Sequence, residues 1–283
     1  MAILFIQEKG YQCIRTIMGT MNKWWFHDYE KVVHAGQAMI TQFRIPSLYR
    51  DYSRYLSTLN INRRVFSLQF ESPITFAAFE SHLDSLAFWL NLGCGGGCLK
   101  TIKPNVSTGN PRPRMQSLRL NGKEHLINAL GLPGPGVQGL IHKLENSELI
   151  RRSCPMGFSV GGHSLSEYQL VVDALLPFIT KQIQQHYLEL NISCPNTSTG
   201  TSMHDNLSDV EALLNYIRQK SSCVIVIKVS PDASDKNLCD LASLASSMEC
   251  VTLNAGNTQL KTTDVLGLPK DSISIGKGGL SGP

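Results

Sequence analysis

The sequence predicts an α/β protein of alternating strands and helices, preceded by a distinct helical segment. Three observations carry this prediction. Beyond residue 70, short apolar segments alternate with longer segments of helical periodicity. The apolar segments are hydrophobic along their whole length, which is typical of a parallel sheet covered on both faces. The first 65 residues differ from the rest in charge and aromatic content.

The composition indicates a folded protein without a membrane span. Of the 283 residues, 42% are hydrophobic and 17% are charged, which excludes a disordered or collagen-like chain. No segment approaches the roughly 18 apolar residues of a spanning helix. The opening MAILFI is too short for a signal-peptide core, so we expect no secretion by that route.

The eight cysteines are scattered through the chain, which predicts a reduced, cytosolic protein. Cys94 and Cys98 form a C-x3-C pair, but no second pair stands at zinc-ligand spacing. Small residues packed around a strand are therefore the favoured interpretation of this pair over a zinc site, and we expect no metal.

Residues 1–65 are predicted to form a helical extension, with a second domain over 66–283. The extension carries nine Lys/Arg, four Asp/Glu and ten of the chain's 21 aromatic residues. Apolar residues recur at helical spacing over 29–44 and, after Pro46, over 48–59. Such helices can lie on a membrane surface, cover a hydrophobic channel, or simply pack on the main domain, and the last is slightly favoured. Without a Lys/Arg cluster or a known motif, nucleic-acid binding is not expected.

The strand and helix pattern predicts six strands and four helices after the extension. The strands are expected at 74–78, 98–102, 156–160, 187–191, 224–228 and 250–254, and the helices at 82–92, 164–185, 209–220 and 236–247. Ser208 and Glu211 are expected to form a capping box at the third helix. This order fits either a βα-barrel or an open doubly wound sheet.

Polar residues cluster where the predicted strands end, which is where such folds place their chemistry. A lone strand-end asparagine is more often a turn former. Five consecutive strands with a polar end favour an enzyme site. In order along the chain these residues are Lys100, Thr101, Ser159, Asn191, Cys194, Lys228 and Asn254. No G-x-G-x-x-G motif follows the first predicted strand and no P-loop motif is present, which argues against dinucleotide binding and P-loop nucleotide binding.

At Glu189–Asn196 the chain reads ELNISCPN, which resembles the dihydroorotate dehydrogenase family of FMN-dependent barrels. The resemblance runs from about Ser72 to Pro283 and includes LKTIKP, GNPRPR, INALGLPG, IKVSPD and GKGGLSG in family order. It implies a TIM-type (β/α)8 barrel, apparently truncated after the sixth strand. The active domain of dihydropyrimidine dehydrogenase is a weaker match.

The resemblance implies flavin-dependent oxidation of dihydroorotate to orotate in de novo pyrimidine (UMP) biosynthesis. Hydride would pass from C6 of the substrate to FMN while a protein base removes the C5 proton. Cys194 matches that base, a residue that is usually serine in the membrane-associated, quinone-using class. A thiolate is a competent base near neutral pH. For the other cysteines, a role as small buried hydrophobic residues is favoured.

The resemblance also assigns binding residues. Substrate contacts are implied for Asn128, Leu130, Gly131, Leu132, Asn191, Asn196 and Asn254, because amides offer both donors and acceptors to a pyrimidine edge. FMN contacts are implied for Ala77, Ala78, Lys100, Thr101, Ser159, Asn191, Lys228, Gly278 and Gly279. The lysines supply positive charge beside a flavin, and the glycines permit close backbone approach.

Two features leave the electron acceptor and the activity open. Cys194 and INALGLPG resemble the soluble class, whereas the extension and GNPRPR resemble the membrane class, so quinone, fumarate and a protein carrier are all allowed. AAFESH lacks the glycine and lysine of the family's A-A-G-F-D-K, so His82 does not inherit the lysine's role.

A barrel of six strands leaves two open edges and lacks the loops that bind the FMN phosphate. A fragment of a longer enzyme is favoured. The alternative is a non-catalytic barrel relative that binds partners or a membrane. A cytoplasmic protein is expected, with peripheral attachment to the inner face of a membrane and a homodimer both allowed.

Overall fold

The computed structural model describes residues 29–42, 61–192 and 206–283, with side chains described from residue 29 to 38 in the first range. Cys194, Asn196 and the helical pattern at 48–59 lie outside these residues. The chain divides into two compact units. The sheet unit comprises Arg44–Gly109 and Gly131–Gln259, and the hairpin unit comprises Met1–Phe43, Asn110–Leu130 and Leu260–Pro283.

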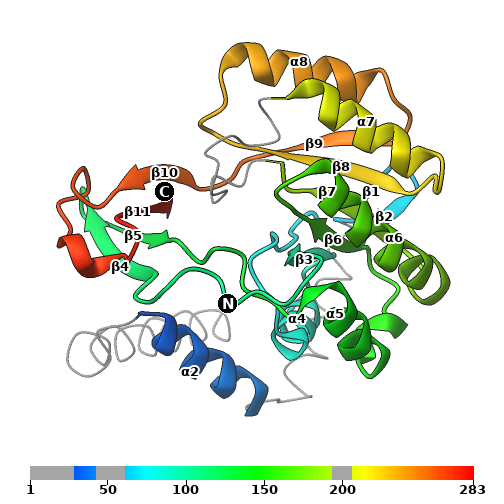
Figure 1. Ribbon diagram of the computed structural model, residues 1–283. Helices are drawn as coiled ribbons and strands as arrows, with labels where there is room; N and C mark the ends of the chain where they lie inside the picture. Colours follow the sequence, from blue (N-terminus) through cyan, green and yellow to red (C-terminus); the bar gives the residue numbers. More distant parts are fainter. Residues whose placement is uncertain (1–28, 43–60, 193–205) are drawn as a thin grey trace. The chain divides into compact units, whose positions relative to one another are not determined.

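Five parallel strands form the centre of the sheet unit, in the order β3-β6-β7-β8-β9 (Figure 1). Their bounds are Gly97–Ile102, Met156–Val160, His186–Leu190, Val224–Val229 and Val251–Ala255. The helices between and around them are α4 (Leu83–Asn91), α5 (Gly136–Glu145), α6 (Leu165–Gln182), α7 (Leu207–Arg218) and α8 (Asp235–Ser246), with a short 3-10 helix at Glu148–Arg151. Each of these strands overlaps a strand predicted from its apolar pattern.

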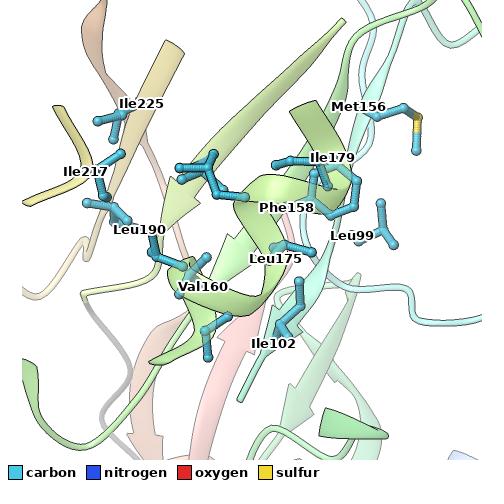
Figure 2. Packing of buried hydrophobic residues seen from close by; sticks show 14 of the residues in the cluster. Leu99, Ile102, Met156, Phe158, Val160, Leu175, Ile179, Leu190, Ile217 and Ile225 are labelled. Atoms are coloured by element: carbon cyan, nitrogen blue, oxygen red, sulfur yellow. The ribbon is translucent and has the colours of Figure 1, made fainter. Parts of the chain in front are cut away.

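The five helices of the sheet unit pack on one face of the parallel sheet. Alternate strand residues such as Leu99, Phe158, Leu188 and Ile225 join one apolar cluster with residues of all five helices. Figure 2 shows Leu99 and Phe158 near Leu175 and Ile179 of α6, and Leu190 and Ile225 beside Ile217 of α7. A doubly wound sheet carries helices on both faces, so this arrangement is the winding of a βα-barrel.

The opposite face of the sheet has a separate, smaller apolar cluster at the beginning of the strands. It contains Cys98, Tyr187 and Val224 together with Leu68. Leu68 belongs to a two-stranded antiparallel hairpin, β1 (Arg63–Val65) and β2 (Leu68–Phe70). This inner face is therefore apolar near the amino ends of the strands.

Two predictions of local structure are wrong. The segment expected to be a strand at 74–78 makes only one parallel bridge, Phe76 to Gly97, and its Ile74 is 66% exposed. The chain turns at once beyond it, where the Phe79 N–H donates to Ala77 O. The expected capping box is also absent, because α7 begins at Leu207, two residues before the predicted start, and Ser208 Oγ donates to Asn206 Oδ1 instead.

The hairpin unit contains a four-stranded sheet of order β10-β11-β5-β4 that the strand–helix pattern did not predict. Its strands are β4 (Met115–Leu120), β5 (Lys123–Asn128), β10 (Gln259–Thr262) and β11 (Lys277–Ser281), and a 3-10 helix spans Lys270–Ser272. Asn121 and Gly122 join β4 to β5, both with positive φ. An Asn-Gly pair between two strands is the signal for such a turn.

Helix α2 (Tyr29–Gln42) lies within the range whose apolar spacing predicted a helix, and it packs against β4. Among the described residues, no helix is both long and apolar enough to cross a membrane.

Candidate functional site

The inner face of the parallel sheet becomes polar toward the carboxyl ends of the strands. Side chains alternate between the two faces of a strand, so the residues between the helix-facing positions point to the inner face. They include Lys100, Ser159, Glu189, Asn191, Lys228 and Asn254. The structure thus brings together six polar side chains from five neighbouring strands or the loop directly after one.

A hydrogen-bond network links three strand ends. Asn191 Nδ2 donates to Thr101 Oγ1 over 2.8 Å, and Thr101 Oγ1 lies 3.1 Å from Ser159 Oγ. All three residues are buried, and Tyr168 of α6 donates its hydroxyl proton to the Asn191 carbonyl oxygen over 2.8 Å. The network fixes the Asn191 amide beside two hydroxyl groups. These are residues to which the sequence assigned substrate and FMN contacts.

A second pair joins β7 to β9. Asn254 Nδ2 donates to Glu189 Oε2 over 2.9 Å. Glu189 is only 2% exposed, and its other oxygen, Oε1, has no hydrogen-bond partner among the described residues. Sequence reasoning overlooked Glu189, although a carboxylate in an otherwise apolar strand was the signal that could have found it.

Positive charge flanks this pair. Lys228 is 9% exposed and lies opposite Asn254 in the register of β8 and β9. Burial raises the pKa of the neighbouring Cys98 thiol well above its usual range; the Glu189 charge raises it further, and the Lys228 charge lowers it. The Glu189 carboxylate and the Lys228 ammonium group therefore both lie close enough to influence the Cys98 thiol.

A pocket in the sheet unit opens at the end of β3. It is lined by Lys100, Thr101 and Lys103 on one side and by the Leu132–Gly136 loop on the other. Gly131 and Leu132 both have positive φ, 70° and 54°. A leucine in the left-handed region is strained. The pocket gathers three predicted contact residues, Lys100, Thr101 and Leu132.

Two further predicted FMN contacts of the sheet unit, Ala77 and Ala78, lie in the segment before α4. Ala78 packs against the smaller apolar cluster, and Ala77 is exposed at the turn before α4. His82 precedes α4 and makes no side-chain cap.

The hairpin unit holds the other predicted contact residues. Asn128 and Gly279 are directly opposite in the β5–β11 ladder, and Asn128 Nδ2 donates to the Gly279 carbonyl oxygen over 3.4 Å. A Cβ on Gly278 would lie 2.6 Å from the Asn128 carbonyl oxygen. The close contact of β11 with β5 is therefore enough to require glycine at this position, without any contact to FMN. Leu130 O lies 3.5 Å from Arg114 Nη1.

The hairpin unit also contains a buried ion cluster that sequence reasoning missed. The Glu30 carboxylate of α2 accepts from Arg114 Nε and Nη2, each over 2.8 Å, and Arg112 Nε lies 3.1 Å from it. Burial raises the Glu30 pKa, but the hydrogen bonds and charges of the two arginines outweigh burial and hold the pKa below its usual value. Both arginines belong to the GNPRPR motif.

The described cysteines with perturbed thiols are poor bases. Burial raises the pKa of Cys154 to about 11, and it also raises the pKa of Cys94 and Cys223. Among the residues that the structure describes, no group of three His, Cys, Asp or Glu side chains could hold a metal ion.

The family model described as dihydroorotate dehydrogenase matches residues 60–283. Two curated relatives are both named dihydroorotate dehydrogenase (quinone). The one from Mycobacterium bovis (strain BCG / Pasteur 1173P2) is 28% identical over 228 residues, which cover 77% of this chain and 60% of the relative. The one from Corynebacterium striatum is 25% identical over 223 residues, 78% of this chain and 60% of the relative. The chain thus spans about 60% of the length of each.

Two solved structures from Eimeria tenella resemble the fold. DHODH in complex with ferulenol superimposes with a TM-score of 0.73 at 19% identity, over 94% of this chain and 76% of that one. The ligand-free form gives a TM-score of 0.63 at 20% identity, over 84% of this chain and 75% of that one. These likenesses confirm the barrel-type α/β fold that the sequence predicted.

Proposed function

Because the chain belongs to the dihydroorotate dehydrogenase family, we propose that its strand ends form the site of a flavin-dependent oxidation of dihydroorotate to orotate, a step of pyrimidine biosynthesis. The observation that carries the proposal is the gathering of Lys100, Ser159, Asn191, Lys228 and Asn254 on one face of consecutive parallel strands. The carboxyl ends of parallel strands are where barrel enzymes place their catalytic groups.

The described residues suit a flavin chemically. Proteins of this family are flavoproteins, and FMN, when bound, supplies the acceptor for a hydride. Lys100 and Lys228 offer positive charge, Thr101 and Ser159 offer hydroxyl groups, and Glu189 Oε1 is a buried acceptor without a partner among the described residues. A ring system that carries N–H and carbonyl groups matches this set of donors and acceptors.

The chain's own residues then have distinct tasks. Cys194 takes the proton from C5 of dihydroorotate, while the hydride leaves C6, so that a carbon–carbon double bond forms. Asn191, Asn196 and Asn254 hold the ring and its carboxylate. The Thr101–Ser159–Asn191 network keeps the Asn191 amide in one orientation before substrate arrives, which lowers the cost of ordering it.

Quinone is the proposed electron acceptor, because the two relatives above carry that word in their names. Contact of residues 1–65 with a membrane belongs to the same proposal, since a quinone is a membrane-dissolved substrate.

The proposal is tested by the visible spectrum of the purified protein. We expect it to retain added FMN and to bleach when dihydroorotate is supplied without oxygen. Dihydroorotate added to FMN alone is the control. Flavin that is retained but not bleached would contradict the proposed reaction, and a protein that retains none would favour a non-catalytic barrel relative.

A further inference from the structure

The buried carboxylate of Glu189 takes no part in the proton and hydride transfers of the proposed reaction. It lies on the inner face of β7, 2% exposed, and accepts one hydrogen bond, from Asn254 Nδ2 over 2.9 Å. Burying a carboxylate costs free energy unless both of its oxygen atoms are hydrogen-bonded. Oε1 has no partner in the part of the chain that the structure describes.

The chemistry of the pair determines how the Asn254 amide is turned. An ionised carboxylate has acceptors and no donor, so only the NH2 end of the amide can face it. If the amide were rotated by 180°, its carbonyl oxygen would face the carboxylate oxygen, and the two oxygen atoms would repel each other. The contact therefore selects one of the two amide orientations that Asn254 could otherwise adopt.

The carbonyl oxygen of the Asn254 amide remains available to accept a hydrogen bond. Asn254 Oδ1 has no partner among the described side chains and backbone groups, and Asn254 is half-buried. It lies directly across from Lys228 in the β8–β9 register, at the polar end of the inner face. The position thus presents a carbonyl oxygen, which accepts from an N–H group.

We infer that Glu189 is a positioning residue that turns Asn254 so that its carbonyl oxygen accepts a ring N–H of the substrate. This inference rests on the proposed function and deepens it, because it explains how the site distinguishes a ring with an N–H at this position from one without. Glu189 acts through Asn254 and does not itself contact the substrate.

The experiment is a double-mutant cycle on orotate binding and dihydroorotate turnover, with the FMN-loaded protein. The variants are Glu189→Leu, Asn254→Ala and the double variant. Leucine removes the acceptor and the buried charge together, so the variant is expected to fold. Glu189→Gln is the conservative second variant, since its amide permits both orientations of Asn254. Asp173→Asn, a surface carboxylate on α6, is the matched control.

We expect Glu189→Leu to raise the KM for dihydroorotate and the Kd of orotate by about tenfold, with a smaller change in kcat, as for the loss of one well-oriented hydrogen bond. Glu189→Gln should lie between wild type and Glu189→Leu, and Asp173→Asn should match wild type. The double variant should be no weaker than Asn254→Ala alone, because both changes remove the same contact.

Additive effects in the double variant, or an unchanged KM in Glu189→Leu, would overturn the inference while leaving the proposed function intact. Wild-type protein that binds FMN but neither binds orotate nor oxidises dihydroorotate would overturn both. The two failures are therefore distinguishable.

Discussion

At the scale of single residues, the surroundings of each cysteine decide whether its thiol can act as a base. A cysteine is a base only as a thiolate, and burial favours the neutral thiol where it outweighs the effect of a nearby cation. Cys98 and Cys154 lie in surroundings that raise their pKa, to about 11 for Cys154. They behave as the small apolar residues that the sequence predicted for the cysteines other than Cys194.

The Cys194→Ala variant is expected to bind FMN and orotate but to lose dihydroorotate oxidation, because the C5 proton then has no acceptor. General-base loss typically costs a factor of about 100 to 10,000 in rate. Anaerobic stopped-flow measurement of flavin bleaching tests this expectation. Cys239→Ala, at an exposed position of α8, is the control. Bleaching at the wild-type rate in Cys194→Ala would exclude Cys194 as the base.

At the scale of elements, the ion cluster of the hairpin unit attaches helix α2 to β4 and its preceding loop. Arg114 reaches Glu30 through two nitrogen atoms and also donates from Nη1 to the Asn110 carbonyl oxygen over 2.9 Å. Paired, multiply hydrogen-bonded charges tolerate burial, whereas a single buried charge does not. The cluster therefore makes the position of α2 depend on one carboxylate.

Replacing Glu30 by alanine is expected to destabilise the protein by about 3–5 kcal/mol, because Arg114 would remain buried without its carboxylate. Urea unfolding followed by circular dichroism measures the change. Glu124→Ala is the matched control, since Glu124 lies 3.8 Å from Arg119 on the exposed side of the same hairpin and exposed pairs contribute about 0–1 kcal/mol. Equal effects of the two changes would contradict the importance of burial.

The same contact has a defined pH dependence. The folded-state pKa of Glu30 lies below its ordinary value of 4.5, since the arginine contacts outweigh burial. Its stabilising contribution is therefore present above that value and is lost as the pH falls through the folded-state pKa. His34, with Nε2 3.9 Å from Glu30, is the nearby titratable group. The stability difference between wild type and Glu30→Ala should shrink as the pH falls below 4.5 and through the lowered folded-state pKa.

At the scale of the whole molecule, charge is unevenly distributed along the chain. Residues 1–65 carry nine Lys/Arg and four Asp/Glu, a balance of +5, and the remainder carries 17 and 18, a balance of −1. A basic, aromatic-rich segment is attracted to anionic lipid, and each basic residue near the surface contributes about 1 kcal/mol.

We expect the full chain to bind anionic liposomes more strongly than neutral ones and to dissociate as salt is added. The joint replacement Arg50→Glu and Arg54→Glu should weaken this binding by well over tenfold, while Lys123→Glu and Lys143→Glu, outside the segment, should not. Liposome sedimentation measures all three proteins. Indistinguishable sedimentation of the two variants would refute a membrane role for residues 1–65.

The strands and helices that show a clear apolar periodicity could be predicted from the sequence. The five parallel strands and the helices α4, α6, α7 and α8 each lie over a predicted range, because apolar periodicity reflects the faces that these segments bury. The segment at 74–78 failed because its apolar residues make a single bridge and a turn follows. The β4–β5 hairpin was overlooked although Asn121–Gly122 marks its turn.

The sequence by itself determined the five parallel strands, the helices α4, α6, α7 and α8, and the polar residues at the strand ends, because these depend on neighbours along the chain. Only the tertiary structure decided which face the helices cover, and which side chains meet. Asn254 and Glu189 are 65 residues apart, Arg114 and Glu30 are 84 apart, and Asn191 and Thr101 are 90 apart. Such pairs depend on strand register and helix packing, which fix distances between segments that no local pattern encodes.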